Sequence, residues 1–176
     1  SSLVFSAAGG GTETENHIIS GDIQLFIRRI DRFLPIATGA KLYTEWGAED
    51  EAGNVPVDVS SITGAYLTDV FKIPGFDAKM EFSKLHSVWY THFKYRSGYT
   101  HRGNYIGHRS GGDSESIAIT GIFTFPNEYE MSTVFSHQRR GLAQSNVEIT
   151  TELQLKFSVI DALEIYNIYN VDVDIF

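Results

Sequence analysis

The chain contains no cysteine among its 176 residues. This absence excludes disulfide scaffolds, cysteine nucleophiles and thiolate-bound zinc or iron–sulfur centres. Proline is scarce, with 4 residues, and no apolar run approaches the roughly 20 residues that a membrane-spanning helix needs. The N-terminus also lacks the basic flank and continuous apolar core of a signal peptide. We therefore expect a protein with no disulfides and no membrane partner.

Basic residues are also few, because 14 lysines and arginines stand against 22 acidic residues and give a net charge of −8. This balance argues against a protein that wraps nucleic acid over its whole surface. Aromatic residues and glycines are frequent, with 12 Phe, 9 Tyr and 16 Gly. Such a composition favours strands and turns over a helical bundle. The length fits one domain with its own core.

Alternation of apolar and polar residues predicts most of the strands. It is strictest over residues 147–159, where the odd-numbered positions are apolar or threonine and the even-numbered ones are polar. Residues 117–125 and 163–176 show the same period, and 33–37 is expected to pair with 41–46. We expect the odd-numbered face of 147–159 to be buried and the even-numbered face to meet water or a polar partner.

Two segments have helical spacing instead. In residues 23–34, one helical face carries Ile23, Phe26, Ile27, Ile30 and Leu34, and the other carries Arg28, Arg29 and Arg32. A second helix is predicted over residues 77–93. Together, the elements predict an all-β fold: an eight-stranded antiparallel jelly-roll sandwich with one or two short helices.

The rest of the chain is interpreted as an arm and a loop. Residues 1–16 are small and polar, which predicts a flexible N-terminal arm before a single jelly-roll domain over residues 17–176. The acidic residues of 45–58 predict a solvated loop, because they lack the spacing of a calcium loop.

The first helical segment resembles the entry to the first jelly-roll strand in capsid proteins of picorna-like viruses. The resemblance lies in an acidic and polar lead at residues 13–16, then Ile19-Ser20-Gly21-Asp22, then Arg28-Arg29 before an apolar strand. Residues 89–90 and 95–98 also approximate the aromatic Trp-Arg-Gly segment of that family.

This resemblance implies a structural coat protein of an icosahedral RNA virus, which self-assembles with sister subunits around the genome. It implies a location in the virion, and in the host cytoplasm during assembly. The implied partners are sister subunits, genomic RNA in weak contact and a host receptor. In this interpretation Arg28, Arg29 and Arg32 bind acidic groups of a neighbouring subunit, such as Asp172 and Asp174.

Residues 92–109 interleave basic and aromatic residues and contain no acid. The pattern suits single-stranded nucleic acid, and it equally suits a strand and loop that pack on the acidic segment 45–58. Both interpretations stay open.

No catalytic pattern is evident. The six histidines do not fall at metal-ligand spacing, and Gly-x-Ser-x-Gly is absent. Glu148 and Glu152 would lie about 13 Å apart on one strand, beyond glycosidase spacing. We therefore predict no catalytic, cofactor-binding or metal-binding residue, no cofactor and no enzyme activity. The alternatives are a carbohydrate- or ligand-binding β-sandwich module and, less favoured, an enzyme on the same sandwich.

Overall fold

A computed structural model describes residues 2–8, 18–49, 51–52, 55–56, 58–89, 100–102, 104–105, 107–126, 129–143, 146–160 and 165–174. Nine long strands dominate these residues: β1 (Ser2–Ala8), β2 (Ile18–Ile27), β3 (Gly39–Glu49), β6 (Val59–Thr68), β7 (Phe76–Leu85), β10 (Ser114–Thr124), β11 (Tyr129–Arg140), β12 (Glu148–Ile160) and β13 (Ile165–Asp174). The shorter elements are β4 (Glu51–Ala52), β5 (Val55–Pro56), β8 (Thr100–His101), β9 (Asn104–Tyr105) and two 3₁₀ helices, η1 (Ile30–Arg32) and η2 (Val70–Lys72).

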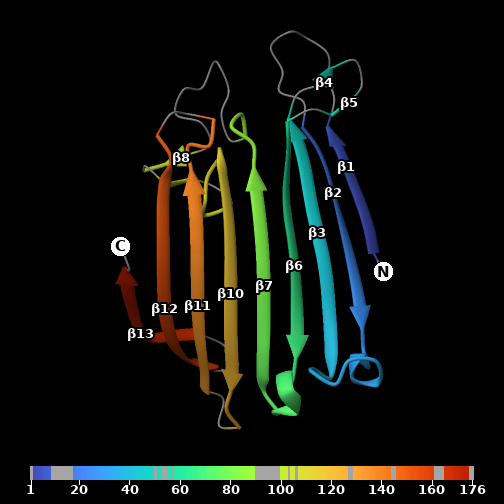
Figure 1. The fold of residues 1–176 in the computed structure, drawn as a ribbon, viewed down its shortest axis with the longest axis vertical. Helices are drawn as coiled ribbons and strands as arrows, with labels where there is room; N and C mark the ends of the chain where they lie inside the picture. The colour runs from blue at the N-terminus through green and yellow to red at the C-terminus, as the bar shows by residue number, and fades with distance from the viewer. Residues whose placement is uncertain are drawn as a thin grey trace.

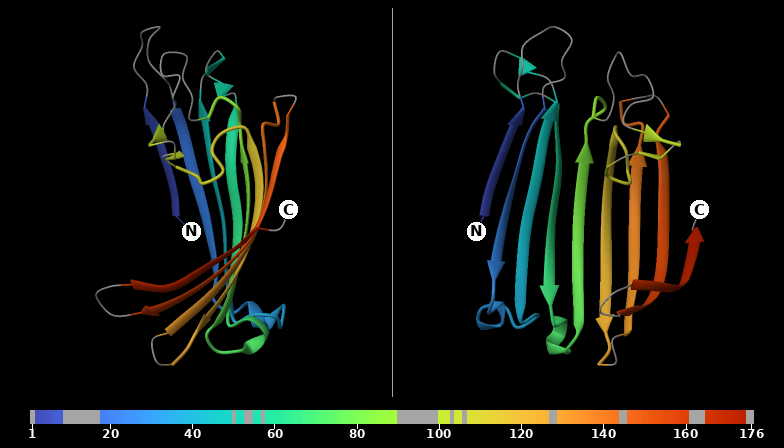
Figure 2. Two further views of the ribbon diagram at one scale, coloured as in Figure 1. Left: turned by 90° about the vertical axis from the view of Figure 1, so that its left-hand side faces the viewer. Right: turned by 180° about the vertical axis from the view of Figure 1, so that it is seen from behind.

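The nine long strands form one sheet in the order β1-β2-β3-β6-β7-β10-β11-β12-β13, so each pairs with the next long strand of the chain (Figure 1). Every pairing in this sheet is antiparallel. The strands β4 and β5, and likewise β8 and β9, pair as separate two-stranded sheets. Figure 2 shows that the long sheet is curved and that β8 and β9 lie beside one of its faces.

The prediction of an all-β antiparallel fold with few helices is confirmed, whereas the eight-stranded jelly-roll sandwich is not. A jelly roll places its strands in two sheets joined by Greek-key connections. The long strands described here form a single sheet without a crossover.

Both predicted helices are wrong. Residues 23–27 belong to β2, which pairs with β3 without interruption from Ile18 to Ile27, and residues 77–85 belong to β7. Within the described residues the helices are η1 and η2, which are three residues long and lie in the turns after β2 and β6. Residues 33–37, predicted as a strand, lie in the first of these turns.

The first part of the predicted N-terminal arm is a strand of the sheet. Residues 2–8 form β1, which pairs with β2 in the register Leu3↔Ile23. Residues 9–17 lie outside the described residues, and the domain boundary at residue 17 stays a prediction.

The strands predicted over 117–125, 147–159 and 163–176 are confirmed as β10, β12 and β13. The predicted burial of the odd-numbered face of β12 is wrong, because Ile149 is 62% exposed and Phe157 is 40% exposed. This face belongs to a larger exposed apolar surface.

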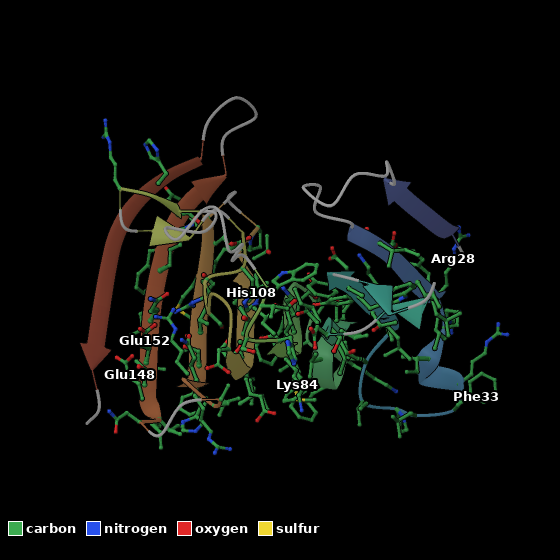
Figure 3. All side chains as sticks on the ribbon, turned by 90° about the horizontal axis from the view of Figure 1, so that it is seen from above. Arg28, Phe33, Lys84, His108, Glu148 and Glu152 are labelled. Atoms are coloured by element: carbon green, nitrogen blue, oxygen red, sulfur yellow. The ribbon has the colours of Figure 1, made fainter. Side chains whose placement is uncertain are left out.

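The register divides the sheet into two unlike faces. The apolar face carries Ile23, Leu25, Leu42, Ala65, Leu67, Met80, Phe82, Ile117, Ile119, Phe135, Leu153, Leu155 and Phe157. The polar face carries Asp22, Gln24, Lys41, Tyr43, Glu45, Tyr66, Lys79, Glu81, Ser83, Ser116, Gln138, Glu152, Gln154 and Lys156. Seen along the strands, Lys84 at the border of the apolar face and His108 beside the polar face lie on opposite sides of the sheet (Figure 3).

Large apolar side chains are exposed across the apolar face, including Met80 at 52% and Ile119 at 46%. Its border on β7, β10 and β11 is charged, where Lys84 Nζ lies 3.3 Å from Glu115 Oε1 and Arg139 Nη1 lies 3.9 Å from Glu115 Oε2. In the part of the chain that the structure describes, no helix is long and apolar enough to span a bilayer.

Candidate functional site

The polar face is partly covered by the segment between β9 and β10. Arg140 on β11 donates from Nε to the carbonyl oxygen of Ser110 and from Nη2 to that of Arg109, both at 2.8 Å. The Ser110 hydroxyl donates to Ser116 Oγ at 3.2 Å, and Ser110 is almost fully buried. Arg109 also forms an ion pair with Glu152 on β12. These contacts fasten the segment over β10, β11 and β12.

A hydrogen-bonded network occupies the middle of the polar face. The Glu81 carboxylate accepts a hydrogen bond from the Tyr43 hydroxyl and lies 2.8 Å from Lys79 Nζ. Burial raises the pKa of Tyr43, and the hydrogen bond to Glu81 raises it further. Burial also raises the pKa of Glu81, but the hydrogen bonds from Lys79 and Tyr43 outweigh it, so the net pKa is lowered. Tyr43 is therefore a fixed donor and Glu81 a fixed acceptor.

Two aromatic rings on this face lie against glycines of neighbouring strands. A Cβ atom at Gly64 on β6 would overlap the ring of Tyr43, and a Cβ atom at Gly47 on β3 would overlap the ring of Trp89. Only glycine permits this close approach of a ring to the strand backbone. Each ring consequently has a defined position on the polar face.

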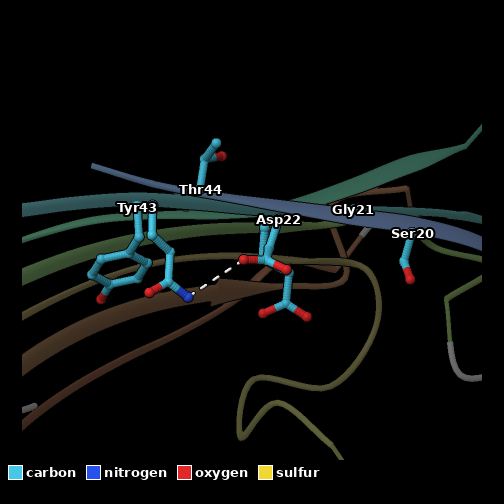
Figure 4. Close-up of a pocket in the computed structure, with 7 residues that line it drawn as sticks. Ser20, Gly21, Asp22, Tyr43 and Thr44 are labelled. Atoms are coloured by element: carbon cyan, nitrogen blue, oxygen red, sulfur yellow. Dashed lines mark hydrogen bonds between the residues drawn. The ribbon is translucent and has the colours of Figure 1, made fainter. Parts of the chain in front are cut away.

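A groove of about 310 Å³ opens on the polar face along β2 and β3. It is lined by Ser20, Gly21, Asp22, Gln24, Tyr43, Thr44 and Glu45. Figure 4 shows that Ser20, Asp22 and Tyr43 point to the same side, whereas the Thr44 side chain points away. A smaller cavity of about 80 Å³ shares Ser20 and Glu45 with this groove and reaches Trp89. The two cavities are thus neighbours, with Tyr43 lining the larger and Trp89 lining the smaller.

Two carboxylates lie opposite each other in the groove. Asp22 on β2 and Glu45 on β3 occupy directly paired positions, an arrangement that weakens a sheet when the charges are alike. Gln24 Nε2 donates to Asp22 Oδ2 at 3.4 Å. Among the described residues, no lysine, arginine or histidine forms an ion pair with either carboxylate. Neither carboxylate of the groove is therefore neutralised by an ion pair within the described ranges.

His108 lies beside this network, and its protonation is expected to weaken the fold. Burial lowers the pKa of His108 below its ordinary 6.5; Glu81 opposes this shift, and Arg109 and Lys79 add to it. Below pH 6.5 the unfolded chain consequently binds more protons than the folded chain, and the free energy of unfolding should decrease as the pH falls. Replacing His108→Asn should remove this part of the pH dependence. Urea unfolding from pH 7.5 to about 5 measures both slopes, and equal slopes would contradict the assignment.

The sequence-predicted sites are not brought together. Arg29 Nε lies 3.0 Å from Asp31 Oδ1 within the same turn, while Arg28 and Arg32 are exposed. Most of the basic and aromatic segment 92–109 falls outside the described residues. The predicted acidic loop begins inside a strand, because Glu45 lies in β3 and faces the groove.

The described histidines have separate surroundings. His86 Nε2 lies 3.2 Å from Asp58 Oδ1, and His137 Nδ1 lies 2.9 Å from the Thr151 hydroxyl. Across the described ranges, no three His, Asp or Glu side chains gather as metal ligands would. The prediction of no catalytic, cofactor-binding or metal-binding residue stays untested.

The fold and the site define a class of protein: a sheet of long, consecutively paired strands, exposed and apolar on one face and grooved and polar on the other. A comparison with protein-family models matches residues 16–174 to the family described as capsule assembly protein Wzi. The chain belongs to this family. Neither the curated proteins nor the solved structures gave a match to it.

The family overturns the viral interpretation. The chain is a member of a bacterial capsule assembly family and not a coat protein of a picorna-like virus. The inferred sister subunits, genomic RNA, host receptor, virion and host cytoplasm are withdrawn with it. The alternative of a carbohydrate- or ligand-binding β-sandwich module is not supported either, because the long strands described here form one sheet and not the two sheets of a sandwich. The physical source of the error is residues 18–27, which form a sheet strand and not an entry helix.

Proposed function

We propose that this protein acts in the assembly of a polysaccharide capsule at the bacterial cell surface. The family supports the process. The observation that carries the proposal is the two-sidedness of the sheet, which combines an exposed apolar face with a polar face that holds a groove. Such a sheet can meet an apolar phase on one side and a hydrated polymer on the other.

We assign the apolar face to membrane lipid. Exposed apolar patches of this extent are rare on proteins that are surrounded by water. The strands β2, β3, β6, β7, β10, β11 and β12 have 10 to 13 residues, and about 9–11 residues are enough for a tilted strand to cross the hydrocarbon core. Backbone groups in lipid must be paired, so the proposal includes strand pairing along the outer edges of β1 and β13. This assignment replaces the expectation of no membrane partner.

We assign the polar face to the polysaccharide. Hydroxyl-rich chains need donors and acceptors at fixed positions, and Tyr43, Glu81 and Lys79 are held by one another. Aromatic rings beside a few placed polar groups are typical of small-ligand sites. The proposed role is to bind and place the polymer, without turnover.

A gene deletion in the bacterium that encodes the protein tests this function. Loss of the protein should reduce the polysaccharide bound at the cell surface, and the wild-type gene should restore it. The polymer's chain length should stay the same, because the proposed role is not enzymatic. A deletion strain with an unchanged surface capsule would contradict the proposal.

A further inference from the structure

We propose that the groove between Tyr43 and Trp89 binds a sugar unit that carries no acidic group, either neutral or amine-bearing. This inference rests on the proposed function and names the class of sugar that its site selects. It is carried by the groove and the smaller cavity beside it, by the aromatic ring that lines each of them, and by two carboxylates that form no ion pair among the described residues.

The rings supply flat apolar surfaces at the two ends of the site. Tyr43 lies over Gly64, and its hydroxyl is held by Glu81. Trp89 lies over Gly47 at the end of the smaller cavity. Aromatic rings offer a large contact area at low conformational cost. A pyranose ring can therefore lie along the groove with its apolar side against one of them.

The carboxylates decide which substituents the sugar can carry. Asp22 and Glu45 only accept hydrogen bonds when ionised, so they suit hydroxyl or ammonium donors. A uronate or phosphate would bring a further negative charge to two that have no basic partner in the described residues. The chain's net charge of −8 also disfavours the approach of an acidic sugar.

Two lysines lie beside the Tyr43 end of the groove, because Lys41 Nζ is 5.4 Å and Lys79 Nζ is 5.9 Å from the centre of the Tyr43 ring. Neither lysine forms an ion pair with Asp22 or Glu45 in the part of the chain that the structure describes. Lys41 Nζ also lies 5.5 Å from the centre of the Phe26 ring. Lys79 Nζ is bound to Glu81. The sheet thus keeps the like charges of Asp22 and Glu45 in paired positions, which lowers its stability. Such a loss of stability is typical of a binding site.

Binding by the full chain in detergent micelles tests the inference. The probes are neutral gluco-oligosaccharides, chitosan oligosaccharides and oligogalacturonates of matched length, titrated at low ionic strength and followed by tryptophan fluorescence and calorimetry. The wild type should bind a neutral or amine-bearing probe at least about tenfold more tightly than oligogalacturonate. Equal or tighter binding of oligogalacturonate, or no binding of any neutral or amine-bearing probe, would overturn the inference.

The double variant Asp22→Asn/Glu45→Gln locates the selectivity in the groove. It should lower the affinity for the preferred probe by about tenfold or more, because hydrogen bonds to charged acceptors are lost. It should also reduce the difference in affinity between the preferred probe and oligogalacturonate. Its Tm should stay equal or rise, since the repulsion is relieved, and this excludes misfolding as the cause. The matched control Glu130→Gln/Glu148→Gln makes the same charge change outside the groove and should bind as the wild type does. If the two variants bind alike, the groove is not the site.

The two proposals can fail separately. A capsule that depends on the protein, together with unselective binding, would reject only the sugar class. Selective binding in a protein whose deletion leaves the capsule unchanged would reject only the role in capsule assembly.

Discussion

Phe135→Lys is expected to destabilise the protein by about 2–4 kcal/mol in a lipid environment. Phe135 lies on the apolar face between Ile119 and Leu153, and a charge in that position would have to enter hydrocarbon. The neighbouring replacement Ser136→Lys introduces the same charge on the polar face, opposite Glu152, and should cost less than about 1 kcal/mol. Urea unfolding of both variants in lipid vesicles measures the difference.

The difference between the free energies of unfolding of the two variants shows whether water or lipid covers the apolar face. Phe135 is already 39% exposed in the isolated sheet, so water at this face would hydrate the lysine. The two variants would then differ only by the loss of the aromatic contacts. Similar free energies of unfolding for Phe135→Lys and Ser136→Lys would contradict the assignment of lipid to this face.

Gly64→Val is expected to destabilise the fold by about 1–3 kcal/mol. The new side chain would overlap the Tyr43 ring, which must then move away from Glu81. Thermal unfolding measures the loss, and a tyrosine titration should show that the pKa of Tyr43 returns toward its ordinary value of 10.0.

Gly121→Val on β10 is the matched control. The nearest atom to a Cβ there lies 3.7 Å away, on Phe76, and valine favours strands over glycine. This variant should therefore be neutral or more stable than the wild type. Equal destabilisation by the two substitutions would show that Tyr43 is not held against Gly64.

The sequence predicted strands well where one face is strictly apolar. Over β12 the alternation from Ile149 to Phe157 leaves only one period that fits, and the strand was predicted correctly. The alternation cannot show whether protein, lipid or water covers the apolar side of the strand. A buried core and the proposed lipid phase would select the same residues, so alternation alone predicts burial for residues that are exposed in the sheet.

Helical and strand periods were confused in β2. Ile23, Phe26 and Ile27 fit a helical face, but Ile23, Leu25 and Ile27 equally fit a strand. The ambiguity arises because Phe26 is an aromatic residue on the polar face, where it packs beside Lys41. The pairing with β3 resolves it, and this pairing depends on residues 13 to 31 positions away along the chain.

The groove was not predicted, because its residues converge only through strand pairing. Asp22 was placed in the lead to a predicted helix and Glu45 in a predicted solvated loop. Asp22 is the single acid of β2 and Glu45 is one of two acids of β3, and the register Asp22↔Glu45 places these two residues side by side. The observable signal was the acid that interrupts each of the two apolar segments.

The most direct test of the account is the pattern of lipid contact along β10, and the absence of native cysteine makes it simple to perform. Single cysteines at Ile117, Ala118, Ile119 and Thr120 would carry a fluorophore, to be quenched by brominated lipids or by aqueous iodide. The account predicts alternation: the labels at 117 and 119 respond to the lipid quencher, and those at 118 and 120 do not. Quenching by iodide at all four positions, without alternation, would contradict it.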